Sequence, residues 1–121
     1  MRKTVALASL LFSLATSAAA LAADKCEINC HECAAQCKQV LAYAKGKKGA
    51  HYAAVRKATE DCAQICQLAE DLKKRNSPLL SQANELCVAA CQKCMEACKA
   101  ANDKKLDACI ASCKSCSECC K

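Results

Sequence analysis

Cysteine dominates this sequence, and its spacing repeats. The chain has 121 residues, of which 15 are cysteine. Three segments carry cysteines at successive steps of four, three and four residues, and another segment carries two cysteines four apart. These stripe positions are Cys26, Cys30, Cys33, Cys37, Cys62, Cys66, Cys87, Cys91, Cys94, Cys98, Cys109, Cys113, Cys116 and Cys120. At about 100° per residue, such steps place the side chains on one face of an α-helix. Each set therefore predicts a helix with sulfur along one side.

Four helices are needed to carry these stripes, and helix-breaking residues divide the chain accordingly. Gly46 and Gly49 interrupt one Ala-rich segment, and Ser77-Pro78 is typical of a helix start. We predict helices near residues 25–45, 51–75, 78–101 and 103–120. The last break depends on Asn102-Asp103 alone, since Asn and Asp favour turns. Periodicity by itself also allows one continuous helix over 78–120.

Helices with one cysteine face predict an all-α fold, an antiparallel up-down-up-down four-helix bundle with a cysteine-lined core. Aromatic residues make up only 2% of the chain, so cysteine must supply much of the buried volume. Cys119 lies about 90° off its stripe and is expected at the periphery. The leucines expected in the core or as end plugs are Leu68, Leu72, Leu79, Leu80, Leu86 and Leu106.

The N-terminal segment has the pattern of a Sec-type signal peptide. Arg2 and Lys3 precede an apolar run, and Ala20-Leu21-Ala22 is a small-residue cleavage site. We predict a signal peptide over 1–22, one exported domain over 23–121 that is periplasmic or secreted, and no membrane contact after cleavage. Without Arg2 and Lys3 the net charge falls from +6 to +4. Basic residues are scattered and aromatics scarce, so we expect no nucleic-acid partner.

Three chemistries could use a column of sulfur. Disulfides are the default in an oxidising compartment, and a helical scaffold or partner-binding module stapled by them remains an alternative. Neighbours within one stripe pair poorly, however, and the odd count leaves at least one thiol over. A zinc or cadmium buffer of the metallothionein kind is the second alternative. Four thiolates per zinc would leave about −2 of charge in a dry core, and no C-x2-C-x2-C loop for an iron–sulfur cluster is present.

Cu(I) is the metal ion whose ligand preference and charge best fit a column of cysteine side chains. It is soft and prefers thiolate ligands, and each thiolate can bridge two coppers. About one Cu(I) per thiolate also leaves the core electrically neutral, which matters because buried unpaired charge is prohibitive. The sequence therefore predicts a store of multiple Cu(I) ions.

The tandem CxxxCxxCxxxC helices in a small Ala- and Lys-rich chain resemble the bacterial copper storage proteins, a cysteine-rich four-helix-bundle family. The resemblance covers the whole of residues 23–121. It implies Cu(I) held inside a pre-formed bundle for copper homeostasis, with the fourteen stripe cysteines as ligands. It also implies copper donor or acceptor proteins as partners and leaves a homo-oligomer open.

Other residues add little chemistry. Family members often place His or Met where copper enters, which makes Met95 and His51 accessory candidates. The off-stripe Cys119 is a third accessory candidate. An exposed polar residue at a helix start is the simpler interpretation of His51, and a surface position that of His31. No nucleophile has a base on its own face, since His31 and Cys30 point to different sides of the helix. We therefore expect no enzyme.

Overall fold

The computed structural model describes residues 28–120, and these residues form helices joined by short turns. The first helix covers residues 28–45. It is followed by α2 (Ala50–Lys74), α3 (Leu80–Ala101), the short 3-10 helix η2 (Lys104–Leu106) and α4 (Asp107–Cys120). The described part contains no strand. The predicted all-α fold is confirmed, as are the four helices.

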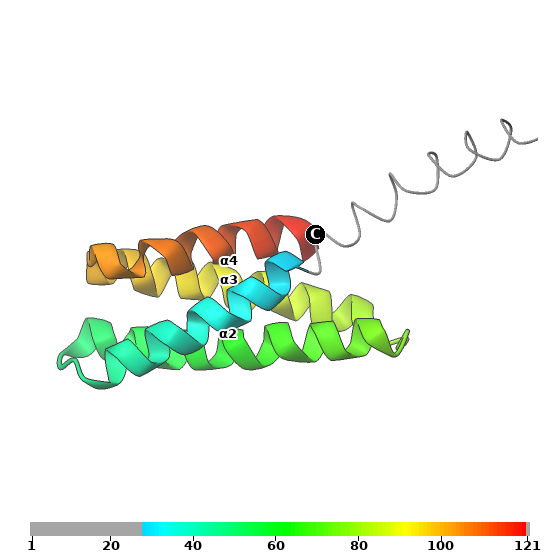
Figure 1. Ribbon diagram of the computed structural model, residues 1–121, viewed down its shortest axis with the longest axis horizontal. Helices are drawn as coiled ribbons and strands as arrows, with labels where there is room; N and C mark the ends of the chain where they lie inside the picture. Colours follow the sequence, from blue (N-terminus) through cyan, green and yellow to red (C-terminus); the bar gives the residue numbers. More distant parts are fainter. Residues whose placement is uncertain (1–27, 121) are drawn as a thin grey trace, which may run out of the picture.

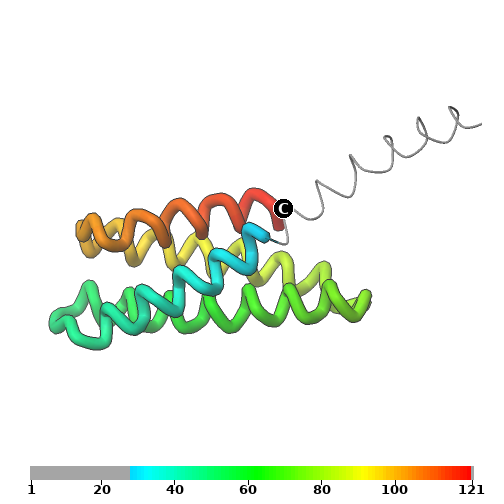
Figure 2. Tube along the Cα trace, viewed as in Figure 1, coloured from blue at the N-terminus to red at the C-terminus, as the bar shows by residue number. Residues whose placement is uncertain are grey.

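Successive helices run in opposite directions along the long axis of the molecule. Figure 1 shows the chain passing from the cyan helix over 28–45 to green α2, yellow α3 and red α4, each reversing the one before. The Cα trace in Figure 2 follows the same path. Helix α3 packs against both α2 and α4. The hairpin between α2 and α3 extends beyond the C-terminal end of α4, so the two ends of the bundle differ in shape (Figure 1).

Positive backbone angles mark the turns. Gly49 precedes α2 with φ 108°, a conformation that favours glycine. Asn102 ends α3 in the left-handed conformation with φ 52° and ψ 47°, which a short polar side chain tolerates. Asn102-Asp103 is therefore a true break, and the continuous helix over 78–120 does not form.

The start of α3 differs slightly from the prediction. The helix begins at Leu80 and not at Pro78, because Ser77 caps a turn that precedes it. The Ser77 hydroxyl accepts a hydrogen bond from the Leu79 backbone N–H at 3.1 Å. The Ser-Pro signal thus located the helix start to within one turn.

Half of the leucines expected in the core are at the surface. Leu72 and Leu106 are buried and Leu80 is half-buried, but Leu68, Leu79 and Leu86 are 44–55% exposed. The reason is steric: cysteine and alanine already occupy the inward faces, so leucines at other helical positions point outward. The prediction that the six leucines lie in the core or as end plugs was wrong for these three, which are exposed.

Two further predictions concern the N-terminus and membranes. The predicted signal peptide over 1–22 and the ligand candidate Cys26 lie outside the described residues. Among residues 28–120, no helix combines the length and apolar character needed to span a bilayer.

Candidate metal centre

The sulfur stripes of all four helices meet in the centre of the bundle. The contacts nearest the start of the 28–45 helix join it to the end of α4. Here the Cys30 sulfur lies 3.0 Å from Cys116 and 3.5 Å from Cys120. Cys87 of α3 lies 3.5 Å from Cys116 and 3.6 Å from Cys120. Three helices therefore supply this first layer of thiols.

The middle of the column adds the two cysteines of α2. Cys66 lies 3.4 Å from Cys87, which links the first layer to this one. Cys62 lies 3.7 Å from Cys91 and 3.9 Å from Cys33. Cys33 in turn contacts Cys113 of α4 at 3.6 Å. All four helices contribute sulfur at this depth.

The deepest layer completes the column. Cys37 lies 3.8 Å from Cys109, 3.9 Å from Cys94 and 4.0 Å from Cys113. Cys98 continues the α3 stripe beyond this layer and is 1% exposed. The predicted column is thus continuous from Cys30 and Cys120 to Cys98, and each described cysteine is a free thiol.

The sulfurs form overlapping groups of four. Five sets have all their sulfur atoms within 4.8 Å of one another. The sets are Cys30/Cys87/Cys116/Cys120, Cys66/Cys87/Cys91/Cys116, Cys33/Cys62/Cys66/Cys91, Cys33/Cys37/Cys62/Cys113 and Cys37/Cys94/Cys109/Cys113. Each set shares at least one cysteine with another. Ions in neighbouring sets would therefore have to share bridging sulfurs, so the column suits a continuous metal–thiolate array better than separate four-ligand sites.

The charge of the column depends on its protons. The buried polar or charged residues of the described chain are Thr59, Glu70 and Ser117, so no Lys or Arg is buried against the thiols. Contacts with Cys116 and other thiols, together with burial, raise the pKa of Cys87. Contacts with Cys109 and Cys94 and burial likewise raise the pKa of Cys98. These thiols are neutral near pH 7 unless a cation replaces the proton.

One end of the column is closed by packing and hydrogen bonds. The buried Val55 and Leu106 are part of the same core cluster as the cysteines. Over them, the Asp103 carboxylate accepts hydrogen bonds from the Tyr43 hydroxyl at 2.7 Å and the Tyr52 hydroxyl at 2.8 Å. We call these five residues the closed end. It joins the end of the 28–45 helix and the start of α2 to the turn between α3 and η2.

Charge strengthens the closed end. The Tyr43 hydroxyl, the Lys105 backbone N–H and the Tyr52 hydroxyl lower the pKa of Asp103 to about 2. The same carboxylate raises the pKa of Tyr43 to about 12. The ammonium groups of Lys47 and Lys105 lie 5.0 and 5.5 Å from the centre of the Tyr43 ring. A surface depression of about 320 Å³ adjoins this end, but Cys98, which lines it, is almost fully buried.

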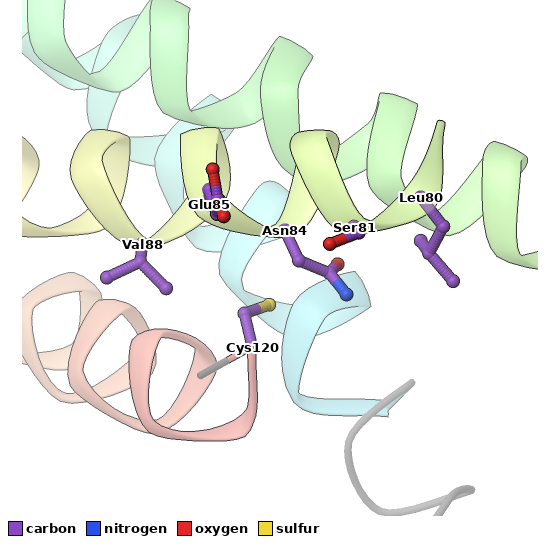
Figure 3. A pocket seen from close by; sticks show the side chains of 6 residues that line it. All are labelled: Leu80, Ser81, Asn84, Glu85, Val88 and Cys120. Carbon is purple, nitrogen blue, oxygen red and sulfur yellow. The ribbon is translucent and has the colours of Figure 1, made fainter. Parts of the chain in front are cut away.

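The opposite end of the column reaches the surface. A cavity of about 100 Å³ is lined by Cys30, Cys119 and Cys120 together with Glu70, Ala69, Lys73, Leu80 and Asn84. We call this end the mouth. Next to it, a groove of about 580 Å³ runs along α3. Figure 3 shows Cys120 of α4 facing the α3 side chains that line this groove.

The carboxylate of Glu70 also lines the mouth and was missed as a candidate, whereas His31 beside it is exposed, as the surface interpretation predicted. Glu70 is only 8% exposed, and its Oε2 lies 3.3 Å from Nδ1 of His31. Its Oε1 lies 3.3 Å from the Lys74 ammonium. The sequence held a signal for Glu70, because it follows Cys62 and Cys66 by further steps of four and so extends the α2 stripe.

The accessory candidates are scattered. Cys119 is off the column as expected: it is half-buried, and its sulfur accepts a hydrogen bond from the Asn29 amide at 3.4 Å. Met95 packs against the outside of the core cluster. His51 is exposed at the start of α2, which lies at the closed end and not at the mouth (Figure 1). Of the three, the structure brings only Cys119 to the mouth.

Comparison with known proteins agrees with this arrangement. The structure is similar to that of a Cu(I)-bound copper storage protein, BsCsp3, with a TM-score of 0.75 and 24% sequence identity, covering 82% of this chain and 94% of that one. The comparison with curated protein sequences gave no match. The family model for copper storage proteins matches residues 13–121. The predicted family is confirmed: this chain belongs to the copper storage protein family.

Proposed function

We propose that this protein stores copper as many Cu(I) ions bound by the buried cysteine thiolates of the bundle. The observation that carries this is the sharing of sulfurs among the overlapping sets of four. A metal ion that needs four cysteine ligands shared with no other ion would leave many thiols of the column without a metal. Cu(I) accepts few ligands and bridging thiolates, so it can fill the column from end to end.

Charge balance supports the same ion. Each thiol that binds a metal loses its proton, and no buried Lys or Arg in the described residues offsets the negative charge. One Cu(I) per thiolate keeps the column neutral, whereas zinc in separate sites of four thiolates leaves about −2 per ion. The interior therefore favours Cu(I) over zinc or cadmium, the main competing cargo.

The wider setting is proposed from the sequence and the family. The ligands are the thirteen described stripe cysteines together with Cys26, with Cys119 as an accessory at the mouth. Residues 1–22 direct export to the periplasm or beyond, and the domain over 23–121 then acts in copper homeostasis. Its partners are copper ions and proteins that donate or accept them, a homo-oligomer is left open, and the chain has no enzymatic role and no nucleic-acid or membrane partner.

An anaerobic titration of the reduced protein with Cu(I), in competition with a coloured Cu(I) chelator, tests the proposal. We expect the chelator to stay colourless until roughly a dozen Cu(I) per chain are bound, as near one-to-one filling of the thiolates requires. Colour after one or two equivalents would show that the cysteines are mainly structural. Parallel zinc additions should displace little Cu(I).

A pair of variants on α4 makes the titration specific. Cys113 belongs to two of the sulfur sets, whereas Ser115 is an exposed hydroxyl on the same helix. Cys113→Ser should bind at least one Cu(I) fewer per chain, and Ser115→Ala should keep the full capacity. Equal capacities for the two variants would contradict storage in the column.

A further inference from the structure

The mouth offers a different set of metal ligands from the rest of the column. Inside, the facing groups are thiols alone. At the mouth, the Glu70 carboxylate lines the same small cavity as the thiols of Cys30, Cys119 and Cys120, and the His31 imidazole contacts that carboxylate. Oxygen and imidazole ligands suit Cu(II), while thiolates alone suit Cu(I). The ligand types thus change from the surface inward.

The mouth also holds the thiols that solvent reaches. Cys119 and Cys120 are half-buried, whereas the other described cysteines are buried. Cys30, which is 7% exposed, lies on the facing helix with its sulfur 3.5 Å from that of Cys120. A movement of about 1.5 Å would bring the two sulfurs to the bond length of a disulfide. A reactive pair of thiols therefore stands beside the oxygen and nitrogen groups.

We propose that the mouth binds Cu(II) and reduces it to Cu(I) at the expense of the Cys30 and Cys120 thiols. Two Cu(II) ions each accept one electron, the two sulfurs form one disulfide, and the two thiol protons are released to solvent. The products are two Cu(I) ions. The reaction is stoichiometric, and a thiol reductant must reopen the disulfide before it can repeat.

The position of the pair gives the Cu(I) a route inward. Cys87 and Cys116 lie within 3.0–3.6 Å of Cys30 or Cys120 and are fully buried members of the column. They remain thiols after the mouth pair is oxidised, so they can receive the reduced ions. This inference rests on the proposed storage function and adds the oxidation state in which copper is first bound.

The experiment adds Cu(II) alone to the reduced, copper-free full-length protein under anaerobic conditions. The unpaired electron of Cu(II) is followed by electron paramagnetic resonance, and the disulfide is mapped by mass spectrometry of the alkylated protein. We expect the signal of two equivalents per chain to disappear, with one disulfide between Cys30 and Cys120. Persistence of the full Cu(II) signal, or loss of it while Cys30 and Cys120 stay free thiols, would overturn the proposal.

Matched variants test the residues. Cys120→Ser should abolish the rapid loss of Cu(II), and Glu70→Gln and His31→Ala should slow it by at least about tenfold by weakening Cu(II) binding. His51→Ala removes the other histidine of the chain, at the far end of the bundle, and should leave the rate unchanged. If His31→Ala and His51→Ala reduce Cu(II) at the same rate, and Glu70→Gln at the wild-type rate, then neither the imidazole nor the carboxylate binds Cu(II). That part of the proposal would be overturned.

A separate titration keeps this inference distinct from storage. Cu(I) supplied directly should still fill Cys120→Ser, with a capacity about one ion below wild type because one thiolate ligand is missing. Filling by Cu(I) without any reduction of Cu(II) would overturn the reduction step while storage stands. Failure to fill with Cu(I) would instead overturn storage itself.

Discussion

The two ends of the cysteine column are built in opposite ways. At the closed end, Val55 and Leu106 fill the interior and Asp103 ties two tyrosines together across a pair of turns. At the mouth, three thiols and a carboxylate line a cavity, and two of these thiols, Cys30 and Cys120, belong to the column itself. The bundle is thus closed by packing and hydrogen bonds at one end, while at the other end its thiols are accessible to solvent.

This difference shows how a store can be stable and still exchange its cargo. The closed end needs no metal for its contacts, because hydrogen bonds and aliphatic packing are complete within the protein. Thiols deep in the column contact mainly one another, so their environment changes when copper replaces protons. Copper movement is therefore expected through the mouth.

The largest expected contrast is in thiol reactivity. In copper-free protein, alkylation should reach Cys119 and Cys120 first, while Cys37 and Cys94, which are 0% exposed, must wait for the bundle to open. Opening that approaches global unfolding costs about 5 kcal/mol or more, so the interior should react at least several thousandfold more slowly. Peptide mapping after timed alkylation measures this. Similar rates at both depths would contradict a sealed column, and denatured protein, in which all thiols react alike, is the control.

Copper loading should stabilise the whole bundle. A ligand present at about a thousand times its dissociation constant adds about 4 kcal/mol to the free energy of unfolding per site. In a domain of this size, 1 kcal/mol raises the midpoint of thermal unfolding by about 4–8 °C, so a rise of more than about 15 °C is expected. Anaerobic circular dichroism melts of copper-free and Cu(I)-loaded protein measure it. Equal midpoints would argue against Cu(I) in the core.

The sequence predicted the column better than it predicted the column's ends. Steps of four and three fix which side of a helix each cysteine occupies, so stripes such as Cys87 to Cys98 could be assigned to the core from spacing alone. The ends depend on contacts between residues that are distant in sequence. Nothing local indicates that Tyr43 and Tyr52 share Asp103, or that Glu70 meets His31.

Leucine shows the limit of composition as a guide. Hydrophobic character predicts burial, but with cysteine and alanine filling the inward faces, Leu68, Leu79 and Leu86 are left outside. Leu106 is buried because η2 places it in the core cluster at the closed end. Which leucine is buried follows from helical phase and turn geometry and not from hydrophobicity.

Replacing Leu106 tests the aliphatic part of the closed end. Leu106→Ala removes a side chain that is 0% exposed and should lower the free energy of unfolding by about 2–5 kcal/mol, because it leaves a cavity. Leu86→Ala, at a position that is 50% exposed, is the matched control and should change it by less than about 0.5 kcal/mol. Chemical denaturation of the copper-free protein measures both. Equal decreases in the free energy of unfolding for the two variants would show that the closed end does not stabilise the bundle.

The smallest expected effect is the pH dependence of the closed end. The pKa of Asp103 is lowered from 3.8 to about 2 in the folded protein, so the ionised carboxylate stabilises the fold above about pH 4, and this contribution is lost as the pH falls toward 2. Asp103→Asn lacks the charge, so its midpoint of thermal unfolding should lie below wild type at pH 6 and converge with it near pH 2. Tyr52→Phe removes one of the two phenol hydroxyls, so its midpoint at pH 6 should lie below wild type by a smaller amount. Because the three proteins share all their other carboxylates, a difference in midpoint that stayed constant from pH 6 to 2 would mean that the charge of Asp103 does not stabilise this end.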